Sequence, residues 1–143
     1  MPYDDEITPY GNLREPPPEL DAVAHQVIGA AIEVHRALGP GLPEEAYQRA
    51  MELELTARGI PFEAQRIVEI IYRNVVVARG KIDLWVCGCL IVELKSVEVV
   101  IPLHRLQTRS YMRIVRQPLG LLINFNVYLL KEGIKRIADT EPY

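Results

Sequence analysis

The chain has 143 residues, of which 49% are hydrophobic and 24% are charged, and a formal net charge of −3. This length suffices for one domain that buries about two thirds of its unfolded surface without disulfides or metals. The acidic balance disfavours a protein that coats nucleic acid through overall basicity, and no apolar run approaches the roughly 20 residues of a membrane span.

The beginning of the chain differs in composition from the rest. Residues 1–18 carry five prolines and show no periodic apolar pattern. They predict an extended, proline-rich tail, followed by a single domain over residues 19–143. The acidic, polar start has neither the basic residues nor the apolar core of a signal peptide, so we expect a cytoplasmic protein with no membrane partner.

Two helices are predicted next. Apolar residues at helical spacing define the first from about 19 to 38, and the Gly-Pro-Gly sequence at 39–41 ends it. The second begins after Gly41 and runs to about Arg58, with Pro43 well placed in its first turn. His35 lies at the edge of the first apolar stripe, where a packed histidine and a ligand both fit the pattern.

Glu44 shares a face of the second helix with apolar residues. At about 100° per residue, the side chains that project within about 80° of one another are Glu44, Tyr47, Met51 and Leu55. A glutamate in a first turn often serves only to stabilise the helix dipole. Because this one has apolar and aromatic neighbours and no obvious local partner, we keep it as a functional candidate.

Residues 80–95, GKIDLWVCGCLIVELK, predict two strands joined by a turn at 87–89. The segments 67–72 and 75–78 are rich in β-branched residues and predict a further strand and turn before this hairpin. Cys87 and Cys89 lie one residue apart. This spacing strains a disulfide and supplies half a zinc site, so we expect structural thiols.

Three charged residues of this hairpin, Asp83, Glu93 and Lys95, fall on one face. If the hairpin is symmetric about Gly88, Asp83 lies directly across from Glu93, with Cβ atoms about 4.5–5.5 Å apart, where like charges repel. A hard cation such as Mg²⁺ would relieve this repulsion, with the Leu94 carbonyl as a further ligand, and Lys95 would orient or deprotonate a water. A cross-strand salt bridge is the alternative.

After a β-prone segment that ends at 101, a third helix is predicted from 102 to about 116. Three polar side chains share one of its faces within about 60°, namely His104, Gln107 and Tyr111. Well over 100° around the helix lies a basic stripe of Arg105, Arg109, Arg113 and Arg116. We assign this stripe to a solvated face, with a phosphate-backbone ridge or an oligomer contact as alternatives.

The last third of the chain predicts a buried strand over 119–125 and a final strand or short helix over 133–138. These elements complete an alternation of helices and strands with the predicted hairpins.

Four motifs resemble the PD-(D/E)XK nuclease superfamily and follow its order along the chain: residues 41–47, Asp83, Glu93-Leu94-Lys95 and residues 107–111. Asp83, followed after nine residues by Glu93-Leu94-Lys95, is similar to its active-site hairpin. Residues 41–47, GLPEEAY, resemble the signature of the GxxExxY proteins, a bacterial and archaeal branch. Residues 107–111, QTRSY, resemble the QxxxY helix of RecB-like nucleases. The similarity spans about residues 20–138.

The resemblance implies an α/β (α+β), restriction-endonuclease-like fold with a mixed central sheet, flanked by helices, in the order αβββαβ. It further implies that Asp83 and Glu93 bind Mg²⁺ or Mn²⁺, that Lys95 positions the nucleophilic water, and that Glu44 is an additional ligand or acts through a water. Gln107 and Tyr111 would orient the lysine, the metal or the phosphate. His104 and Tyr47 complete the set of orienting candidates.

Together these features predict a metal-dependent nuclease that hydrolyses the backbone of DNA in preference to RNA. The alternative is a catalytically inactive binding or scaffold module of the same fold, whose partners dock on the arginine stripe. The sequence leaves open whether the chain works alone, as a homodimer or with a protein partner.

Overall fold

The computed structural model describes residues 16–139. Its elements, in chain order, are α1 (Pro18–Leu38), α2 (Glu44–Ala57), β1 (Phe62–Tyr72), β2 (Val75–Val86), β3 (Leu90–Lys95), α3 (Pro102–Val115), β4 (Leu119–Asn124), α4 (Leu130–Gly133) and β5 (Ile134–Ala138). Most of the predicted tail, residues 1–15, lies outside the described part. Within that part, no helix combines the length and the apolar character that a membrane crossing requires.

The strands form one five-stranded sheet in the order β1-β2-β3-β4-β5. Strands β3 and β4 run parallel and every other neighbouring pair is antiparallel. The parallel pair needs a crossover, which α3 supplies. The predicted mixed sheet flanked by helices is therefore confirmed, with the order αβββαβ running from α2 to β4.

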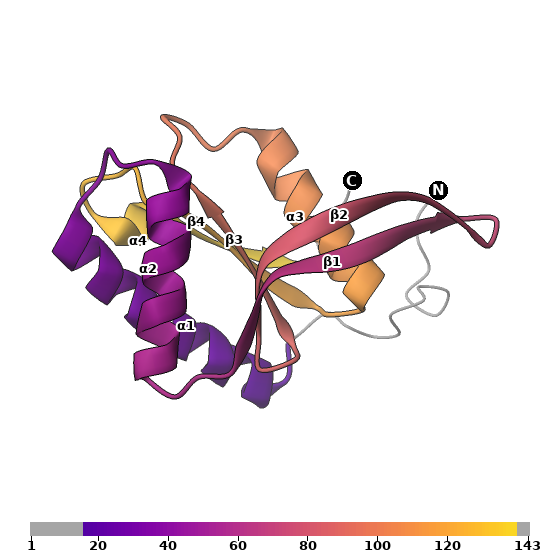
Figure 1. Cartoon of the computed structure of the whole chain (residues 1–143), viewed down its shortest axis with the longest axis horizontal. Helices are drawn as coiled ribbons and strands as arrows, with labels where there is room; N and C mark the ends of the chain where they lie inside the picture. The colour runs from indigo at the N-terminus through magenta and orange to yellow at the C-terminus, as the bar shows by residue number, and fades with distance from the viewer. Residues whose placement is uncertain (1–15, 140–143) are drawn as a thin grey trace.

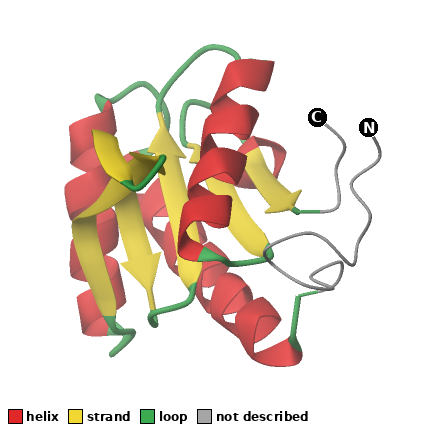
Figure 2. Ribbon diagram, turned by 90° about the vertical axis from the view of Figure 1, so that its right-hand side faces the viewer, coloured by secondary structure: helices red, strands yellow, loops and turns green. Residues whose placement is uncertain are grey.

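Helices cover both faces of the sheet (Figures 1 and 2). Helices α1 and α2 pack on one face, where a larger core includes Val27, Tyr47 and Leu121. Helix α3 packs on the other face over a smaller core that includes Trp85, Met112 and Leu122. The predicted apolar faces of α1 and α2 turn largely inward because burying apolar surface is the main favourable term in folding. On α3, by contrast, Leu106 and Ile114 remain exposed.

The predicted hairpin at 80–95 is confirmed, with its turn at 87–89 and a register that places Trp85 opposite Ile91. The further strand and turn predicted before it are confirmed as β1 and its turn, with residues 75–78 at the beginning of β2. Strands β1 and β2 turn at Arg73 and Asn74, which have φ of 50° and 64°. Two left-handed residues in succession favour a tight hairpin turn that matches the strand twist.

The β1–β2 hairpin continues beyond the body of the sheet (Figure 1). We call its projecting part, residues 66–80, the arm. Tyr111 of α3 packs against the base of the arm at Gly80, where a Cβ would approach the tyrosine Cζ to 2.8 Å. Glycine at this position lets the aromatic ring contact the β2 backbone directly.

Two sequence expectations differ from the structure in the segment around α3. Residues 96–101 form no strand; instead, the Asn124 side chain holds Val97 by accepting from its N–H (3.1 Å) and donating to its carbonyl (2.8 Å). The solvated arginine stripe is wrong for Arg109, which is 5% exposed and pairs with Asp139 at 3.8 Å, and for Arg113, which pairs with the same carboxylate at 3.3 Å.

Arg109 and Arg113 are shielded from solvent because α3 lies close to the sheet. Gly120 of β4 has no side chain, and a Cβ there would meet Met112 Sδ at 3.0 Å and Thr108 Cγ2 at 3.2 Å. Thr108, Arg109 and Met112 therefore form the buried side of α3. His35 is likewise a packed histidine, with Nε2 at 2.7 Å from the Val127 carbonyl.

We expect Gly80→Ala to lower the free energy of unfolding by about 1–3 kcal/mol, because the added methyl group overlaps the Tyr111 ring. Chemical denaturation measures the change. Gly29→Ala is the control: it lies within α1, where its Cβ has ordinary space, and it should stabilise the protein by about 0.5–1 kcal/mol. Equal effects of the two substitutions would contradict the close contact.

Candidate active site

Asp83 marks the point where β2 stops pairing with β3. The ladder between these strands ends at Leu84 opposite Val92. One residue further, Asp83 Oδ2 accepts a hydrogen bond of 2.8 Å from the backbone N–H of Leu94. The carboxylate thus takes the place of a strand carbonyl, and it is fixed beside Glu93 at the end of the sheet ladder.

Glu93 is almost fully buried, with 5% of its surface exposed. Burial raises its pKa to about 9, the charge of the adjacent Asp83 adds to this increase, and Lys95 opposes it. Among the described residues, its Oε1 atom is buried without a hydrogen-bond partner. A buried carboxyl group of this kind is costly unless a proton or a cation accompanies it.

Lys95 and Glu44 complete the charged cluster. Lys95 follows Glu93 by two residues on β3, so the two side chains share a face of the sheet. Glu44, at the start of α2, is largely exposed, yet its partial burial raises its pKa. The charge of Lys95 opposes this increase, and the charge of Asp83 adds to it. The structure therefore brings Asp83, Glu93, Lys95 and Glu44 within electrostatic range.

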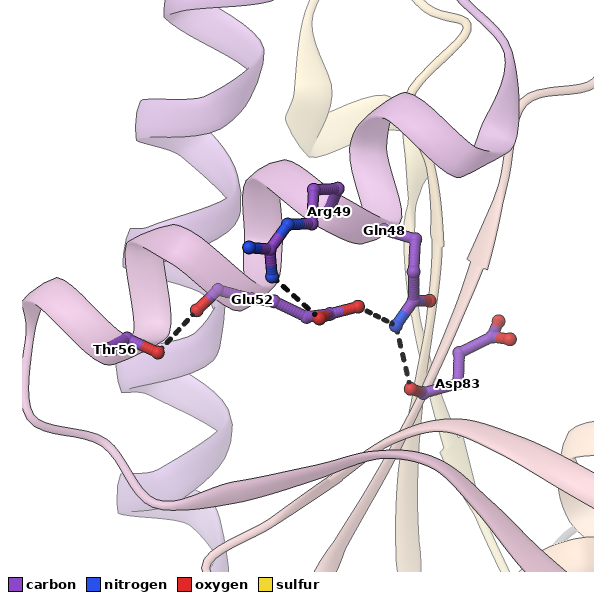
Figure 3. A network of polar contacts seen from close by, with 5 residues as sticks. All are labelled: Gln48, Arg49, Glu52, Thr56 and Asp83. Atoms are coloured by element: carbon purple, nitrogen blue, oxygen red, sulfur yellow. Dashed lines mark hydrogen bonds and ion pairs between the residues drawn. The ribbon is translucent and has the colours of Figure 1, made fainter.

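Helix α2 is tied to β2 at Asp83 by Gln48 (Figure 3). Gln48 Nε2 donates to the Asp83 carbonyl at 3.0 Å and to Glu52 Oε2 at 3.1 Å. Glu52 also accepts from Arg49 at 3.2 Å. This network holds the main chain of Asp83, while its carboxylate points away toward β3.

Tyr47 positions the loop that leads into α2. Its ring is fully buried and stacks on Phe125, with ring centroids 4.5 Å apart. Its hydroxyl donates to the Gly39 carbonyl at 2.6 Å and accepts from the Leu42 N–H at 3.1 Å. Tyr47 therefore contacts the loop that leads to Glu44, the first residue of α2.

The segment after Lys95 is fastened to the same loop and to β4. Ser96 Oγ donates to the Leu42 carbonyl at 2.6 Å. The Lys95 carbonyl accepts from the Phe125 N–H at 2.9 Å. Asn124 also binds Val97. Hydrogen bonds therefore link the ends of β3 and β4 to the loop before α2, next to the charged cluster.

The three polar residues of α3 have different surroundings. His104 Nδ1 accepts from the Ile101 N–H at 3.2 Å and so caps the helix. Tyr111 contacts Gly80, three residues before Asp83. Gln107 is exposed one turn before Tyr111. The structure brings Tyr111 to the strand that carries Asp83, and it leaves Gln107 facing solvent.

The donor set fits a hard divalent cation that keeps part of its water shell. Within residues 16–139, His, Cys, Asp and Glu side chains do not gather in a group of three or more that could enclose a metal. Asp83 and Glu93 nevertheless offer paired carboxylates, and one buried oxygen of Glu93 has no other partner. Mg²⁺ typically binds through one or two carboxylates, waters and substrate phosphates.

Sequence reasoning missed the residues that support the cluster. Gln48, Ser96 and Asn124 each bond to segments distant in the chain. Gln48 carried a weak local signal, since it follows Glu44 by one helical turn. Ser96 and Asn124 carried none, because an isolated polar residue at a strand end is common in any chain.

Comparisons with known proteins were made for the whole chain. A family model described as PD-(D/E)XK nuclease superfamily matches residues 21–137. No curated protein and no solved structure gives a significant match. The matched segment contains the sheet, α2, α3 and the charged cluster.

The raised pKa of Glu93 predicts a pH-dependent stability in the presence of a chelator. Folded protein keeps a proton on Glu93 that unfolded protein releases between pH 4.5 and about 9. The free energy of unfolding contributed by this group should therefore fall as pH rises through that window, by at most about 1.4 kcal/mol per pH unit. Glu93→Gln should remove this slope and be relatively more stable at high pH.

Urea denaturation across this pH range measures the effect. The control is Glu98→Gln, which makes the same change at an exposed glutamate and should follow the wild-type curve. Parallel curves for wild type and Glu93→Gln would contradict a buried, protonated Glu93.

Proposed function

Because the chain belongs to the PD-(D/E)XK nuclease superfamily, we propose that it is a divalent-metal-dependent phosphodiesterase that cleaves the backbone of nucleic acid. The observation that carries the proposal is the buried Glu93 oxygen without a partner, placed beside Asp83 and Lys95. A structural salt bridge would not leave a carboxylate oxygen unsatisfied in the interior, because such a group costs folding free energy.

In this proposal, Asp83 and Glu93 hold Mg²⁺ or Mn²⁺, with the Leu94 carbonyl and Glu44 as further oxygen ligands, Glu44 directly or through a water. When bound, the cation polarises a phosphoryl oxygen and makes a water molecule more acidic. The hydrogen bond from the Leu94 N–H keeps one Asp83 oxygen oriented, so the other is free to turn toward the cation.

Lys95 has the role of positioning the attacking water. Its ammonium group has three donors and no acceptor, so it can bind the water oxygen and a phosphate oxygen at the same time. The water loses a proton to solvent as its oxygen bonds to phosphorus, the bond from phosphorus to the leaving sugar oxygen breaks, and that oxygen takes up a proton from solvent. The partly exposed position of Lys95 supports access of a substrate from solvent.

The remaining candidates act at the rim of the site. Gln107 is exposed and is proposed to bind a substrate phosphate. Tyr111 positions β2 through its contact with Gly80, His104 sets the start of α3 through its cap, and Tyr47 sets the loop before Glu44. Only Gln107 of these four is proposed to meet the substrate itself.

Several finer assignments belong to the same proposal. The motif at 41–47 supports membership of the GxxExxY branch, and the two free thiols at Cys87 and Cys89 suit the reducing cytoplasm. DNA is the proposed substrate in preference to RNA. A scaffold function has less support, because Arg109 and Arg113 of its expected docking stripe are engaged with Asp139.

Lys95→Ala should reduce the rate of DNA cleavage with Mn²⁺ by roughly 10²–10⁴-fold, because it removes the group that orients the water. Mn²⁺ binding, measured by calorimetry, should persist. Lys131→Ala, which removes an exposed lysine of α4, should leave the rate unchanged. Wild-type protein that cleaves neither DNA nor RNA, and that binds no Mn²⁺ through Asp83 and Glu93, would instead be a binding module.

Gln48→Ala should weaken Mn²⁺ binding about tenfold, because the Asp83 main chain loses its tie to α2. Calorimetric titration measures the affinity. Gln26→Ala makes the same change at an exposed position of α1 and should bind as wild type does. An unchanged affinity for Gln48→Ala would show that β2 holds Asp83 without help from α2.

A further inference from the structure

The arm exposes an unusual amount of apolar surface for a small protein. Six of its side chains are between 37% and 67% exposed, namely Ile67, Ile71, Tyr72, Val75, Val76 and Val77. Successive side chains of a strand point to opposite faces, so Ile67, Ile71 and Val76 share one face of the arm while Tyr72 and Val75 lie on the other. Exposed apolar side chains that gather on one face of a soluble protein commonly mark an interaction site. The candidate active site uses none of these side chains.

The arm also carries a free strand edge. Strand β1 is the first in the sheet order, so within residues 16–139 one of its edges has no neighbouring strand. An unpaired edge is a template for another strand unless lysine, proline, a bulge or shortness protects it. The register shift between β1 and β2 lies near their turn, between Ile70 and Ile71, and the pairing before it has no shift. Strand β1 is 11 residues long and contains neither lysine nor proline. The opposite edge strand, β5, has 5 residues and contains Lys135 and Arg136.

Charges along this edge alternate in sign. Glu63, Arg66, Glu69 and Arg73 follow one another along β1 and its turn. If a second copy of β1 lies antiparallel along this edge, Glu63 of one copy lies near Arg73 of the other, so opposite charges meet. The existing pairs, Arg66 with Glu63 and Arg79 with Glu69, are exposed, so exchanging partners costs little.

Other occupants suit the arm less well. Residues 62–81 contain four basic and two acidic side chains, and the two acidic ones already neutralise half of the basic charge. A ridge that follows phosphates needs several free cations. Apolar side chains beside alternating charges are instead typical of a protein surface, and an antiparallel copy of the same edge satisfies both features.

We propose that the arm joins two copies of this chain, with the β1 edges antiparallel around a twofold axis. In this arrangement the β1 backbones exchange hydrogen bonds, and Ile67 and Ile71, which share one face of β1, lie beside the same residues of the second copy. The contact uses the same patch on both subunits, as twofold symmetry requires. It does not depend on whether the site cleaves nucleic acid.

Sedimentation of the full chain over a concentration series tests the proposal. Wild type should be a dimer, and Ile67→Lys with Ile71→Lys should weaken dimerisation at least about a hundredfold. The matched control is Leu53→Lys with Leu129→Lys, at side chains exposed to 57% and 55% outside the arm, which should remain dimeric. Thermal melting checks that each variant is folded.

A charge exchange tests the antiparallel arrangement. Arg73→Glu alone should weaken the dimer, and adding Glu63→Arg to it should restore the affinity. A wild-type monomer at all concentrations, or a dimer that the arm substitutions leave intact, overturns the proposal. A monomer whose arm substitutions weaken DNA binding also overturns it and assigns the arm to the substrate.

Discussion

The hydrogen bond between the Asp83 carboxylate and the Leu94 N–H is the constraint on which the candidate site depends. It lies where β2 leaves β3, one residue beyond the last paired position. Without it, the Leu94 N–H would lose its partner, and the Asp83 carboxylate, which the register of β2 on β3 already places near Glu93, would no longer be held in a fixed orientation. Because the bond is made by the side chain of one strand and the backbone of the next, it couples the end of the sheet ladder to the charge cluster.

The cluster is costly in itself, and the surrounding structure compensates for that cost. Glu93 is buried next to a second carboxylate, so its pKa is raised to about 9. Gln48 holds Asp83 from α2, Asn124 holds the segment after β3, and Tyr47 holds the loop before Glu44. Charged groups in a low-dielectric site attract a counter-ion strongly and need rigid support to remain there. The supporting bonds therefore concentrate around the charged cluster, at one end of β3 and β4.

The β1–β2 hairpin contributes both to the charged candidate site, at its base, and to the exposed apolar arm, at its tip. At its base, β2 carries Asp83 and is packed against Tyr111 through Gly80. Beyond that point the arm has lost its helical cover, so its β-branched residues face solvent. The twist of a long two-stranded hairpin carries it away from the sheet (Figure 1). The arm and the site are therefore adjacent in the chain, but the arm exposes apolar side chains whereas the site contains charged ones.

The sequence by itself determined the local features of this protein. Local sequence signals predicted α1, α2 and α3, and the assumed symmetry of the turn at 87–89 predicted the register of β2 on β3. Both kinds of feature depend on residues that are close together in the chain. The proximity of Glu93 to Asp83 followed from that register. Only the tertiary structure decided that Arg109 is buried, because this depends on Gly120 allowing α3 to approach β4. It also decided that Gln48, Ser96 and Asn124 support the cluster, since each bonds to a segment between 27 and 54 residues away, and contacts at such separation leave no periodic signal in the sequence.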